Sequence, residues 1–455
     1  MGDFRGIADR IALDIARGRL RAGQRLPPQR AFARRHGIAA STAGRVYAEL
    51  VRRGLVVGEV GRGTFVRAAH VTPPGRALVE AGDARINLEL NYPSVPGQSE
   101  LLAPALAPLL RPDALTDALR PAAADGTPDA REAVAALLAT GDWRPDPGRV
   151  LFTGNARQAV AATLGSLVRP GGRVGVEPLT YPLVKEIAGR LGIVLVPVRA
   201  DERGPVVESV LAAHRAAPLS ALYLQPTLHN PTSLTVPAER RLHLARAVDD
   251  LGLPVVEDRI WSFLHDGPEP PLAALAPRWV HLVDGLSKRV APGLTVGFAV
   301  VPEHRVDAVA AAVRSGGWSA GAFALEAAVR WIGDGTVARL VAAKREQAAR
   351  RQGLVREALA GFTVRAHPAG YFAWWELPEP WRADDFTAAA ADLGIAVTPG
   401  TAFRVDPKRT PDAVRLGMAS ATEPELVGAL RALAGLAAHG PRHPRADGYG
   451  PSSRP

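Results

Sequence analysis

The 455-residue sequence contains no cysteine, and no apolar run approaches the roughly 18 residues needed to span a bilayer. The missing thiols exclude disulfide bonds, thiolate metal sites and cysteine nucleophiles, and we expect no metal site. Without such a run, we expect no membrane partner. The charged Asp3 and Arg5 near the start argue against a signal peptide, so we expect a cytoplasmic protein. The apolar content of 47% suffices for a large core, and the length predicts two or more domains.

Lysine is scarce, because the chain has four lysines against 51 arginines, so an ordinary surface cation would be expected to be arginine. An amine can condense with an aldehyde, whereas a guanidinium stays protonated. Lys288 follows an apolar run over residues 279–283 that predicts a buried strand, and a second apolar run over residues 294–301 comes after it. This placement favours a covalent site at Lys288. A strand-edge lysine paired with an acid is the alternative.

The positive charge is concentrated at the start of the chain. Residues 1–67 hold 14 arginines and no lysine against five acidic residues, a formal charge of +9, whereas the whole chain carries +10. One small domain that neutralises nucleic-acid phosphates would have this distribution. A solvated basic face is the alternative.

Short helices are predicted within this basic segment. Ile7, Ile11 and Ile15 lie four residues apart on one helical face. Residues 29–35 predict a short second helix, and Gly37 supplies its end.

A third helix and a hairpin are predicted to follow. Ser41 or Thr42 would cap the third helix, which runs to about Arg53. Its inward-facing residues would be Val46, Leu50 and Val51. Residues 55–57 and 64–66 flank a glycine-rich tip and predict a β-hairpin beside a helix-turn-helix.

The elements Leu26-Pro27-Pro28-Gln29-Arg30 and Gly61-Arg62-Gly63-Thr64 resemble the winged helix of GntR-type bacterial regulators. The resemblance implies that residues 1–67 form a winged-helix DNA-binding domain for double-stranded operator DNA. The residues that it implies at the DNA are Arg30, Ser41, Thr42, Arg45 and Arg62.

Residues 68–86 predict a linker, and residues 87–436 alternate strand-like apolar runs with helical runs. Such alternation predicts an α/β domain with a mostly parallel central sheet. A small C-terminal α+β lobe is expected over residues 310–436, and residues 437–455 predict a disordered tail.

Polar motifs follow several of these predicted strands. The turn over residues 153–159 precedes a helix whose free amides can bind a dianion. Tyr181 and Asn230 lie in two further loops, and Asp258 follows a buried strand 30 residues before Lys288. Taken singly, each has an ordinary alternative, namely a plain turn, aromatic packing, a turn-forming Asn-Pro pair or a solvated acid.

The order turn, Tyr, Asn, Asp, Lys resembles class I and II aminotransferases, the fold-type I enzymes that hold pyridoxal 5′-phosphate (PLP) as an internal aldimine. The resemblance implies that Lys288 is the catalytic lysine and that Asp258 keeps the pyridine nitrogen protonated. The other cofactor-binding residues that it implies are Asn155, Ala156, Arg157, Tyr181, Asn230, Ser287 and Arg289. Arg415 is implied to bind a substrate carboxylate bidentately.

Three positions depart from that pattern. Thr295 occupies the place of an arginine that pairs with the phosphate, and Arg289 could compensate for it. Trp261 stands where a tyrosine is common, and residues 119–125 lack the tyrosine that a partner subunit normally offers. We therefore expect PLP binding with altered phosphate contacts.

A GntR-type head joined to an aminotransferase-like domain resembles the MocR-type regulators. The resemblance implies a homodimeric, PLP-dependent transcriptional regulator that senses an amino compound or PLP through Lys288. Two alternatives remain, namely an active aminotransferase carrying a DNA-binding head and a repressor whose large domain only dimerises.

Overall fold

The computed structural model describes residues 24–52, 56–59, 63–66, 84–293, 296–405 and 412–440, together with isolated positions before residue 24. The chain divides into two compact units, residues 1–79 (the head unit) and residues 80–455 (the main unit). Ile15, Arg53, Arg62 and Thr295, most of the predicted linker and the tail beyond residue 440 lie outside the described residues.

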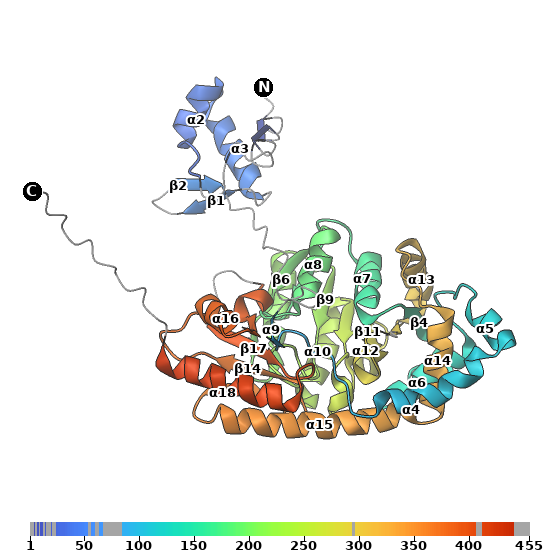
Figure 1. Ribbon diagram of the computed structural model, residues 1–455. Helices are drawn as coiled ribbons and strands as arrows, with labels where there is room; N and C mark the ends of the chain where they lie inside the picture. The colour runs from blue at the N-terminus through green and yellow to red at the C-terminus, as the bar shows by residue number, and fades with distance from the viewer. Residues whose placement is uncertain are drawn as a thin grey trace, which may run out of the picture. The chain divides into compact units, whose positions relative to one another are not determined.

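From residue 24 onward, the described part of the head unit contains two helices and a hairpin (Figure 1). Helix α2 spans Gln29–His36 and ends where Gly37 adopts a left-handed conformation, with φ of 62°. Helix α3 spans Ala40–Arg52, and the antiparallel strands β1 (Val56–Glu59) and β2 (Gly63–Val66) form the predicted hairpin. Phe32, Val46 and Leu50 are buried in its core.

Two details of the predicted third helix were wrong. Helix α3 begins at Ala40, so Ser41 and Thr42 lie in its first turn and do not cap it. Val51 is 49% exposed, because the buried face follows Ala43, Val46, Tyr47 and Leu50.

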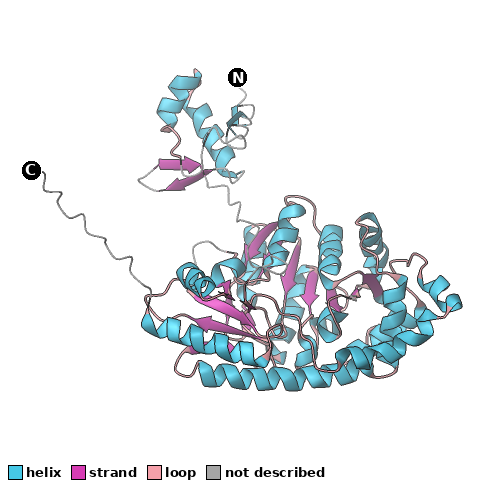
Figure 2. Cartoon of the chain, viewed as in Figure 1, coloured by secondary structure: helices cyan, strands magenta, loops and turns pink. Residues whose placement is uncertain are grey.

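The main unit is built on a seven-stranded sheet (Figure 2). In spatial order the strands are β4 Val150–Thr153, β12 Gly297–Val300, β11 Val280–Gly285, β10 Val255–Asp258, β9 Ala221–Leu224, β5 Arg173–Val176 and β6 Val194–Pro197. Strand β12 is antiparallel to both of its neighbours, and the other six strands share one direction. The central strands are buried along their whole length, as expected when helices cover both faces of a parallel sheet.

Helices cover both faces of this sheet. One face packs against α6 Pro128–Leu138, α9 Val207–Ala216, α10 Ala238–Leu251 and α14 Ala322–Gly333. The other face packs against α7 Ala156–Leu167, α8 Pro182–Arg190 and α13 Val306–Ser315. Shorter helices of the unit are α4 Gln98–Leu106, α5 Pro112–Ala118, α11 Leu272–Leu275, α12 Leu286–Arg289 and α17 Gly400–Phe403.

Helix α15, Thr336–Ala358, leads from this sheet to the C-terminal lobe. The lobe's sheet has the order β13 Thr363–Ala366, β14 Phe372–Glu376, β17 Ala413–Gly417 and β16 Thr398–Pro399. Its helices are α16 Ala383–Asp392 and α18 Glu423–His439, and β3 Ile86–Asn87 pairs in parallel with β15 Ile395–Ala396.

The boundaries of the lobe differ from the predicted ones. Helices α13 and α14 pack on the central sheet, so the lobe begins near residue 336 and not at 310. Ile86 pairs with Ile395 although it was assigned to the linker. Helix α18 continues to His439, past the predicted start of the tail, because Ala437 is buried in the lobe's core.

Candidate functional site

Polar side chains follow the carboxyl ends of five parallel strands of the main sheet. Asn155 follows β4, Glu177 follows β5, Gln225 follows β9, Asp258 ends β10 and Lys288 follows β11. Because these strands run in one direction, their carboxyl ends meet at one edge of the sheet, where ligands of open α/β sheets bind. The structure therefore brings the predicted motifs to a common edge.

Lys288 lies on α12, one helical turn after β11 and not at the strand end itself. Its Nζ donates to the Asn91 carbonyl oxygen at 2.7 Å and lies 4.3 Å from the centre of the Tyr92 ring. Burial, together with the positive charges of Arg415, Arg157 and Lys344, lowers the Lys288 pKa to about 7. A large fraction of this amine is thus unprotonated near neutral pH, as a nucleophile requires.

Asp258 is buried and accepts two hydrogen bonds. Its Oδ2 accepts from the Tyr223 hydroxyl at 2.6 Å, and its Oδ1 accepts from the Ile260 amide at 3.0 Å. Burial raises the Asp258 pKa to about 6, while the bond from Tyr223 opposes that rise. Tyr223 was not predicted from the sequence, because its only signal is a hydroxyl within the apolar run of β9.

A chain of hydrogen bonds reaches Asn230 from the neighbouring strands. Glu177 Oε1 accepts from the Gln225 amide at 3.1 Å, and Gln225 Oε1 accepts from the Asn230 amide nitrogen at 2.8 Å. The side-chain oxygen Oδ1 of Asn230 and the Glu177 Oε2 are buried without a hydrogen-bond partner among the described residues. Such atoms cost about 1–3 kcal/mol each unless a ligand or water meets them.

The N-terminus of α7 is held against two strands by close backbone contacts. The Asn155 side chain caps α7 by accepting from the Gln158 amide at 3.0 Å. A Cβ at Gly297 would lie 2.1 Å from the Asn155 carbonyl carbon, so β12 can approach the turn only with glycine there. Ala156 opens the helix, and Arg157 in its first turn is exposed.

Tyr181 and Arg415 lie close enough to the Lys288 site for charges to act between them. Burial raises the Tyr181 pKa to about 12, and the charges of Arg157, Asp258 and Arg415 act on it. Arg415 on β17 is buried and donates to Thr398 Oγ1 at 2.8 Å and to the Glu89 carbonyl. Its Nε has no hydrogen-bond partner among the described residues. Ser287 is partly buried beside Lys288 on α12.

Arg289 does not join this group. Its guanidinium donates to Asp284 Oδ1 at 2.5 Å and lies 5.3 Å from the Phe263 ring centre, and its side chain is only 5% exposed. A buried carboxylate thus engages this arginine, so the structure does not support the prediction that Arg289 replaces the missing phosphate-binding arginine.

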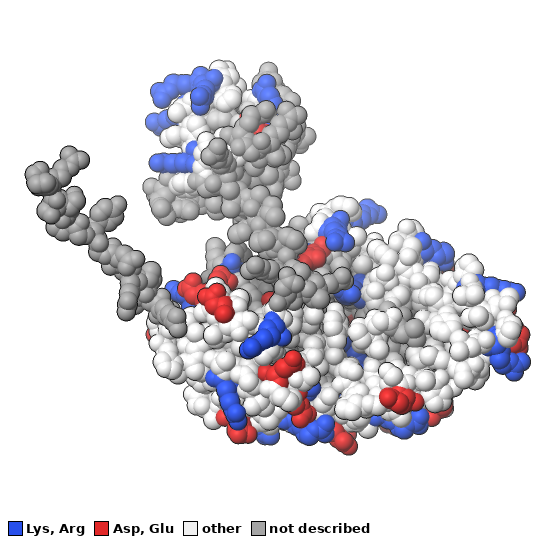
Figure 3. Space-filling view, viewed as in Figure 1, with Lys and Arg blue, Asp and Glu red and all other residues white. Residues whose placement is uncertain are grey.

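Exposed basic side chains line the two helices of the head unit. Arg30 on α2, and Ser41 and Arg45 on α3, are exposed, and Thr42 is partly buried. The guanidinium of Arg45 lies 4.5 Å from the Phe4 ring centre. Figure 3 shows basic side chains gathered on the viewed face of this unit. These positions suit contacts with a polyanion, while Arg62 lies outside the described residues.

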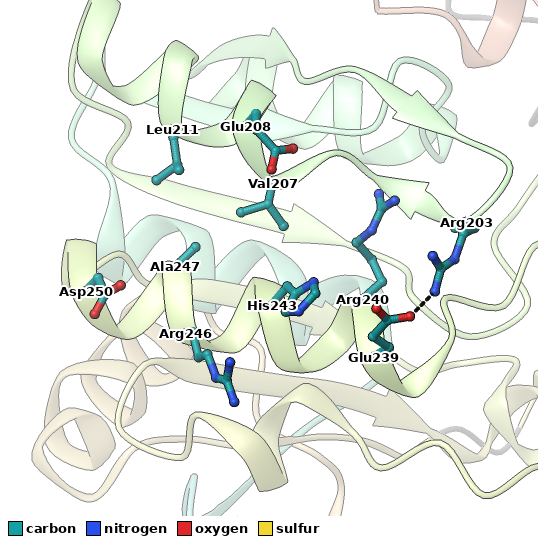
Figure 4. Close-up of a pocket in the computed structure, with 10 residues that line it drawn as sticks. All are labelled: Arg203, Val207, Glu208, Leu211, Glu239, Arg240, His243, Arg246, Ala247 and Asp250. Carbon is teal, nitrogen blue, oxygen red and sulfur yellow. Dashed lines mark hydrogen bonds and ion pairs between the residues drawn. The ribbon is translucent and has the colours of Figure 1, made fainter.

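A surface groove between α9 and α10 has a volume of about 400 Å³ (Figure 4). Two of its three arginines are paired, since Arg203 lies 2.5 Å from Glu239 and Arg240 lies 2.9 Å from Asp201. It lies away from the strand ends that carry Lys288 and Asp258, and we assign it no function.

Within the described residues, no group of three His, Asp or Glu side chains has an arrangement that could hold a metal ion. No helix in the same part of the chain is long and apolar enough to cross a membrane.

Comparison with known proteins identifies both units. Residues 86–433 match the aminotransferase class I and II family, and residues 4–66 match the bacterial regulatory proteins of the gntR family. The uncharacterized HTH-type transcriptional regulator YdeF of Bacillus subtilis is 30% identical over 91% of this chain and 90% of its own length. The HTH-type pyridoxine biosynthesis transcriptional regulator PdxR of Corynebacterium glutamicum is 26% identical over 78% of each chain.

Among solved structures, the α-aminoadipate aminotransferase LysN of Thermus thermophilus, complexed with N-(5′-phosphopyridoxyl)-L-leucine, superposes with a TM-score of 0.70. It is 23% identical and covers 77% of this chain and 91% of its own, which confirms the predicted fold. The chain therefore belongs to the aminotransferase class I and II family and, through its gntR-family head, to the helix-turn-helix transcriptional regulators of the MocR type.

Proposed function

We propose that this protein is a PLP-dependent transcriptional regulator whose head unit binds double-stranded operator DNA and whose main unit senses an amino compound or PLP at Lys288. One observation carries the proposal: a partly buried amine, a buried carboxylate and the capped N-terminus of α7 meet at one edge of the sheet. The name of PdxR, a regulator of pyridoxine biosynthesis, agrees with an effector of this chemistry.

The residues at this edge fit PLP. When bound, PLP supplies an aldehyde that can exchange one amine for another and a ring that withdraws electrons from the attached carbon. Lys288 would attach the aldehyde through Nζ, and Asp258 would hold a proton on the pyridine nitrogen. The Asn230 side chain, whose Oδ1 lacks a partner among the described residues, would donate through its Nδ2 to a ring oxygen, and the first amides of α7 suit a phosphate.

The pKa of Asp258 supports this assignment. Burial raises the Asp258 pKa to about 6, so part of this carboxyl is protonated near neutral pH. A cation beside it would lower that pKa and favour the ionised carboxylate. A protonated pyridine nitrogen supplies that cation. The Tyr223 hydroxyl, which donates to Asp258, keeps one oxygen oriented while the ring is absent.

An effector would bind by contacting both Lys288 and Arg415. An amino compound competes with the Lys288 amine for the same aldehyde carbon, and Arg415 with its unpaired Nε can bind a carboxylate. The effector can change DNA binding only if it binds two arrangements of the chain with different affinity. Arg415 belongs to the C-terminal lobe and Lys288 to the main sheet, so a ligand that contacts both would favour one placement of the lobe.

A second candidate function is transamination. The observation that favours it is that the site keeps the full set of predicted side chains: Lys288, Asp258, Asn230, Tyr181 and Arg415. In addition, a 2-aminoadipate transaminase of Thermus thermophilus is 26% identical over 56% of this chain. Steady transfer of amino groups to a keto acid at about 1 s⁻¹ or faster would favour the enzyme. Turnover far below that rate, with ligand-dependent DNA binding, would favour the regulator.

A homodimer in the cytoplasm is part of the proposal. Leu110 and Leu119 flank α5 and are 65% and 72% exposed, so they are candidates for contact with a second copy of the chain. Light scattering on the purified full chain tests the mass, and a monomer at micromolar concentration would contradict this part.

Borohydride reduction of the PLP-saturated chain, followed by peptide mass mapping, tests the covalent site. With only four lysines, the adduct has few possible positions, and we expect it on Lys288. A Lys288→Ala variant should lose both the visible absorbance and the adduct. An unmodified Lys288 peptide in saturated protein would overturn the proposal.

A further inference from the structure

A second lysine lies beside the one that the proposed function uses. Lys344 lies on α15, is fully buried, and is one of only four lysines in the chain. Its Nζ donates to three consecutive carbonyl oxygens, those of Lys288 at 3.0 Å, Arg289 at 2.9 Å and Val290 at 2.7 Å. Lysine offers three donors and all three are used.

These three carbonyls belong to the turn that carries the amine. Helix α12 is a single turn, Leu286–Arg289, and carbonyls at a helix end have no partner within the helix. Lys344 supplies those partners from a different element, so its ammonium closes the end of α12. The contact joins the Lys288 backbone to a helix of 23 residues that leads to the C-terminal lobe.

The position of Lys344 is itself held from the lobe. The Tyr371 hydroxyl lies 2.8 Å from both the Lys344 carbonyl oxygen and Gln347 Oε1. Tyr371 is buried and packs near Trp261, whose ring lies 5.2 Å from Lys288 Nζ. Tyr371 thus holds the Lys344 backbone, and the Lys344 side chain is fully buried away from solvent.

Lys344 also acts on Lys288 electrostatically. Burial lowers the Lys344 pKa to about 7, and the charge of Lys344 contributes to the lowered pKa of Lys288. The other charged groups that lower the Lys288 pKa are Arg415 and Arg157, and the rings of Tyr92 and Trp261 face its amine.

We propose that Lys344 is a positioning residue for Lys288: its three hydrogen bonds fix the α12 turn, and its charge favours the unprotonated Lys288 amine. This inference rests on the proposed role of Lys288 as the covalent site. It assigns to Lys344 both the geometry and the protonation state of that amine, beyond filling space in the core.

The test measures the Lys288 amine directly in the cofactor-free full chain. Protein labelled with ¹³C at the lysine Cε has four signals, which single-lysine variants assign. In a Lys344→Met variant, we expect the titration midpoint of Lys288 to rise, though by less than the loss of Arg415 would raise it, because the smallest of the positive charges that act on Lys288 is removed. Lys344→Arg keeps the charge and should leave the midpoint close to that of the wild type.

Lys185→Met is the matched control. Lys185 donates one hydrogen bond to the Ala402 carbonyl at 2.7 Å and does not act on Lys288. Its replacement should leave the Lys288 midpoint unchanged. If Lys344→Met does not fold by circular dichroism, Lys344→Gln removes the charge while keeping a donor, and the same rise is expected.

A second readout uses the PLP-loaded chain. The pH midpoint of its visible absorbance should shift in Lys344→Met and return toward the wild-type value in Lys344→Arg. A folded charge-free variant in which both midpoints equal those of the wild type would overturn the inference. Failure of the proposed function looks different, because PLP would then label no Lys288 even in the wild type, while the NMR midpoints would still report on Lys344.

Discussion

The Tyr223 hydroxyl donates to Asp258 Oδ2 at 2.6 Å inside the core of the main unit, where Tyr223 is fully buried. Strands β9 and β10 pair in parallel, and Tyr223 pairs with Val256, two residues before Asp258, so both side chains lie on the same face of the sheet. Asp258 is the carboxylate proposed to face the pyridine nitrogen, so Tyr223 holds the orientation of the group on which cofactor binding depends.

Replacing Tyr223 with Phe should weaken PLP binding about tenfold. A hydrogen bond to a charged group contributes about 1.5–3 kcal/mol, and its loss lets the Asp258 pKa rise further above 6, which favours the neutral acid. Absorbance titration with PLP measures the effect. Tyr47→Phe is the control, since it removes a buried hydroxyl in the head unit that donates to Pro27. Equal affinities for the two variants would contradict the role of Tyr223.

Replacing Asp258 with Asn should stabilise the cofactor-free chain at neutral pH while abolishing tight PLP binding. The folded pKa of Asp258, about 6, lies above its unfolded value of 3.8. The folded chain therefore holds the Asp258 proton more tightly than the unfolded chain does. The stability that this gives is fully present below pH 3.8 and is lost as the pH rises through 6. The variant should gain on the order of 3 kcal/mol in the free energy of unfolding at pH 7–8, and none below about pH 4.

Urea unfolding of the main unit at several pH values measures this gain. Asp250→Asn, at an exposed carboxylate, is the control and should show no such pH dependence. An Asp258→Asn variant with unchanged stability at pH 7 and unchanged PLP affinity would show that neither the burial nor the proposed contact matters.

Sequence alone predicted the parts that local pattern determines. The apolar runs placed the strands of the main sheet, and the order of motifs placed Lys288 and Asp258 after adjacent strands. Tyr223 was missed because a tyrosine in an apolar strand has the pattern of an ordinary core residue. The partner of Arg289 was missed because Asp284, five positions earlier, looks like a solvated acid until β11 is known to be buried throughout.

Lys344 is a clearer example of a side chain whose partners the sequence does not reveal. It lies 56 residues from Lys288, on a helix whose sequence has many charged residues, and only packing shows that its ammonium points inward. The boundaries of α3 and α18 were also misplaced, since caps and terminal turns depend on which neighbours they meet.

Replacing Gly297 with Ala should disturb the α7 turn. The added Cβ would lie 2.1 Å from the Asn155 carbonyl carbon and 2.5 Å from the Ala156 nitrogen, so backbone must move. We expect a loss of about 3 kcal/mol in the free energy of unfolding, with PLP affinity falling as the amides of α7 shift. Gly293→Ala is the control, because nothing lies within 4 Å of its Cβ. Similar stability and affinity for both variants would show that the close approach is not required.

Replacing both Arg30 and Arg45 with Ala should abolish retardation of the DNA upstream of the protein's own gene at moderate salt, leaving weak binding that can be measured at low salt, without changing the PLP absorbance. Both side chains are exposed on the head unit, and DNA affinity depends on phosphate neutralisation. Each lost phosphate contact should reduce the slope of log K against log salt by about 0.9, so the double variant should lose about two in slope. Arg190→Ala, at an exposed position of the main unit, should bind DNA like the wild type. Retardation by the double variant with an unaltered salt dependence would mean that another surface binds the DNA, and the proposed helix-turn-helix contacts would have to be abandoned.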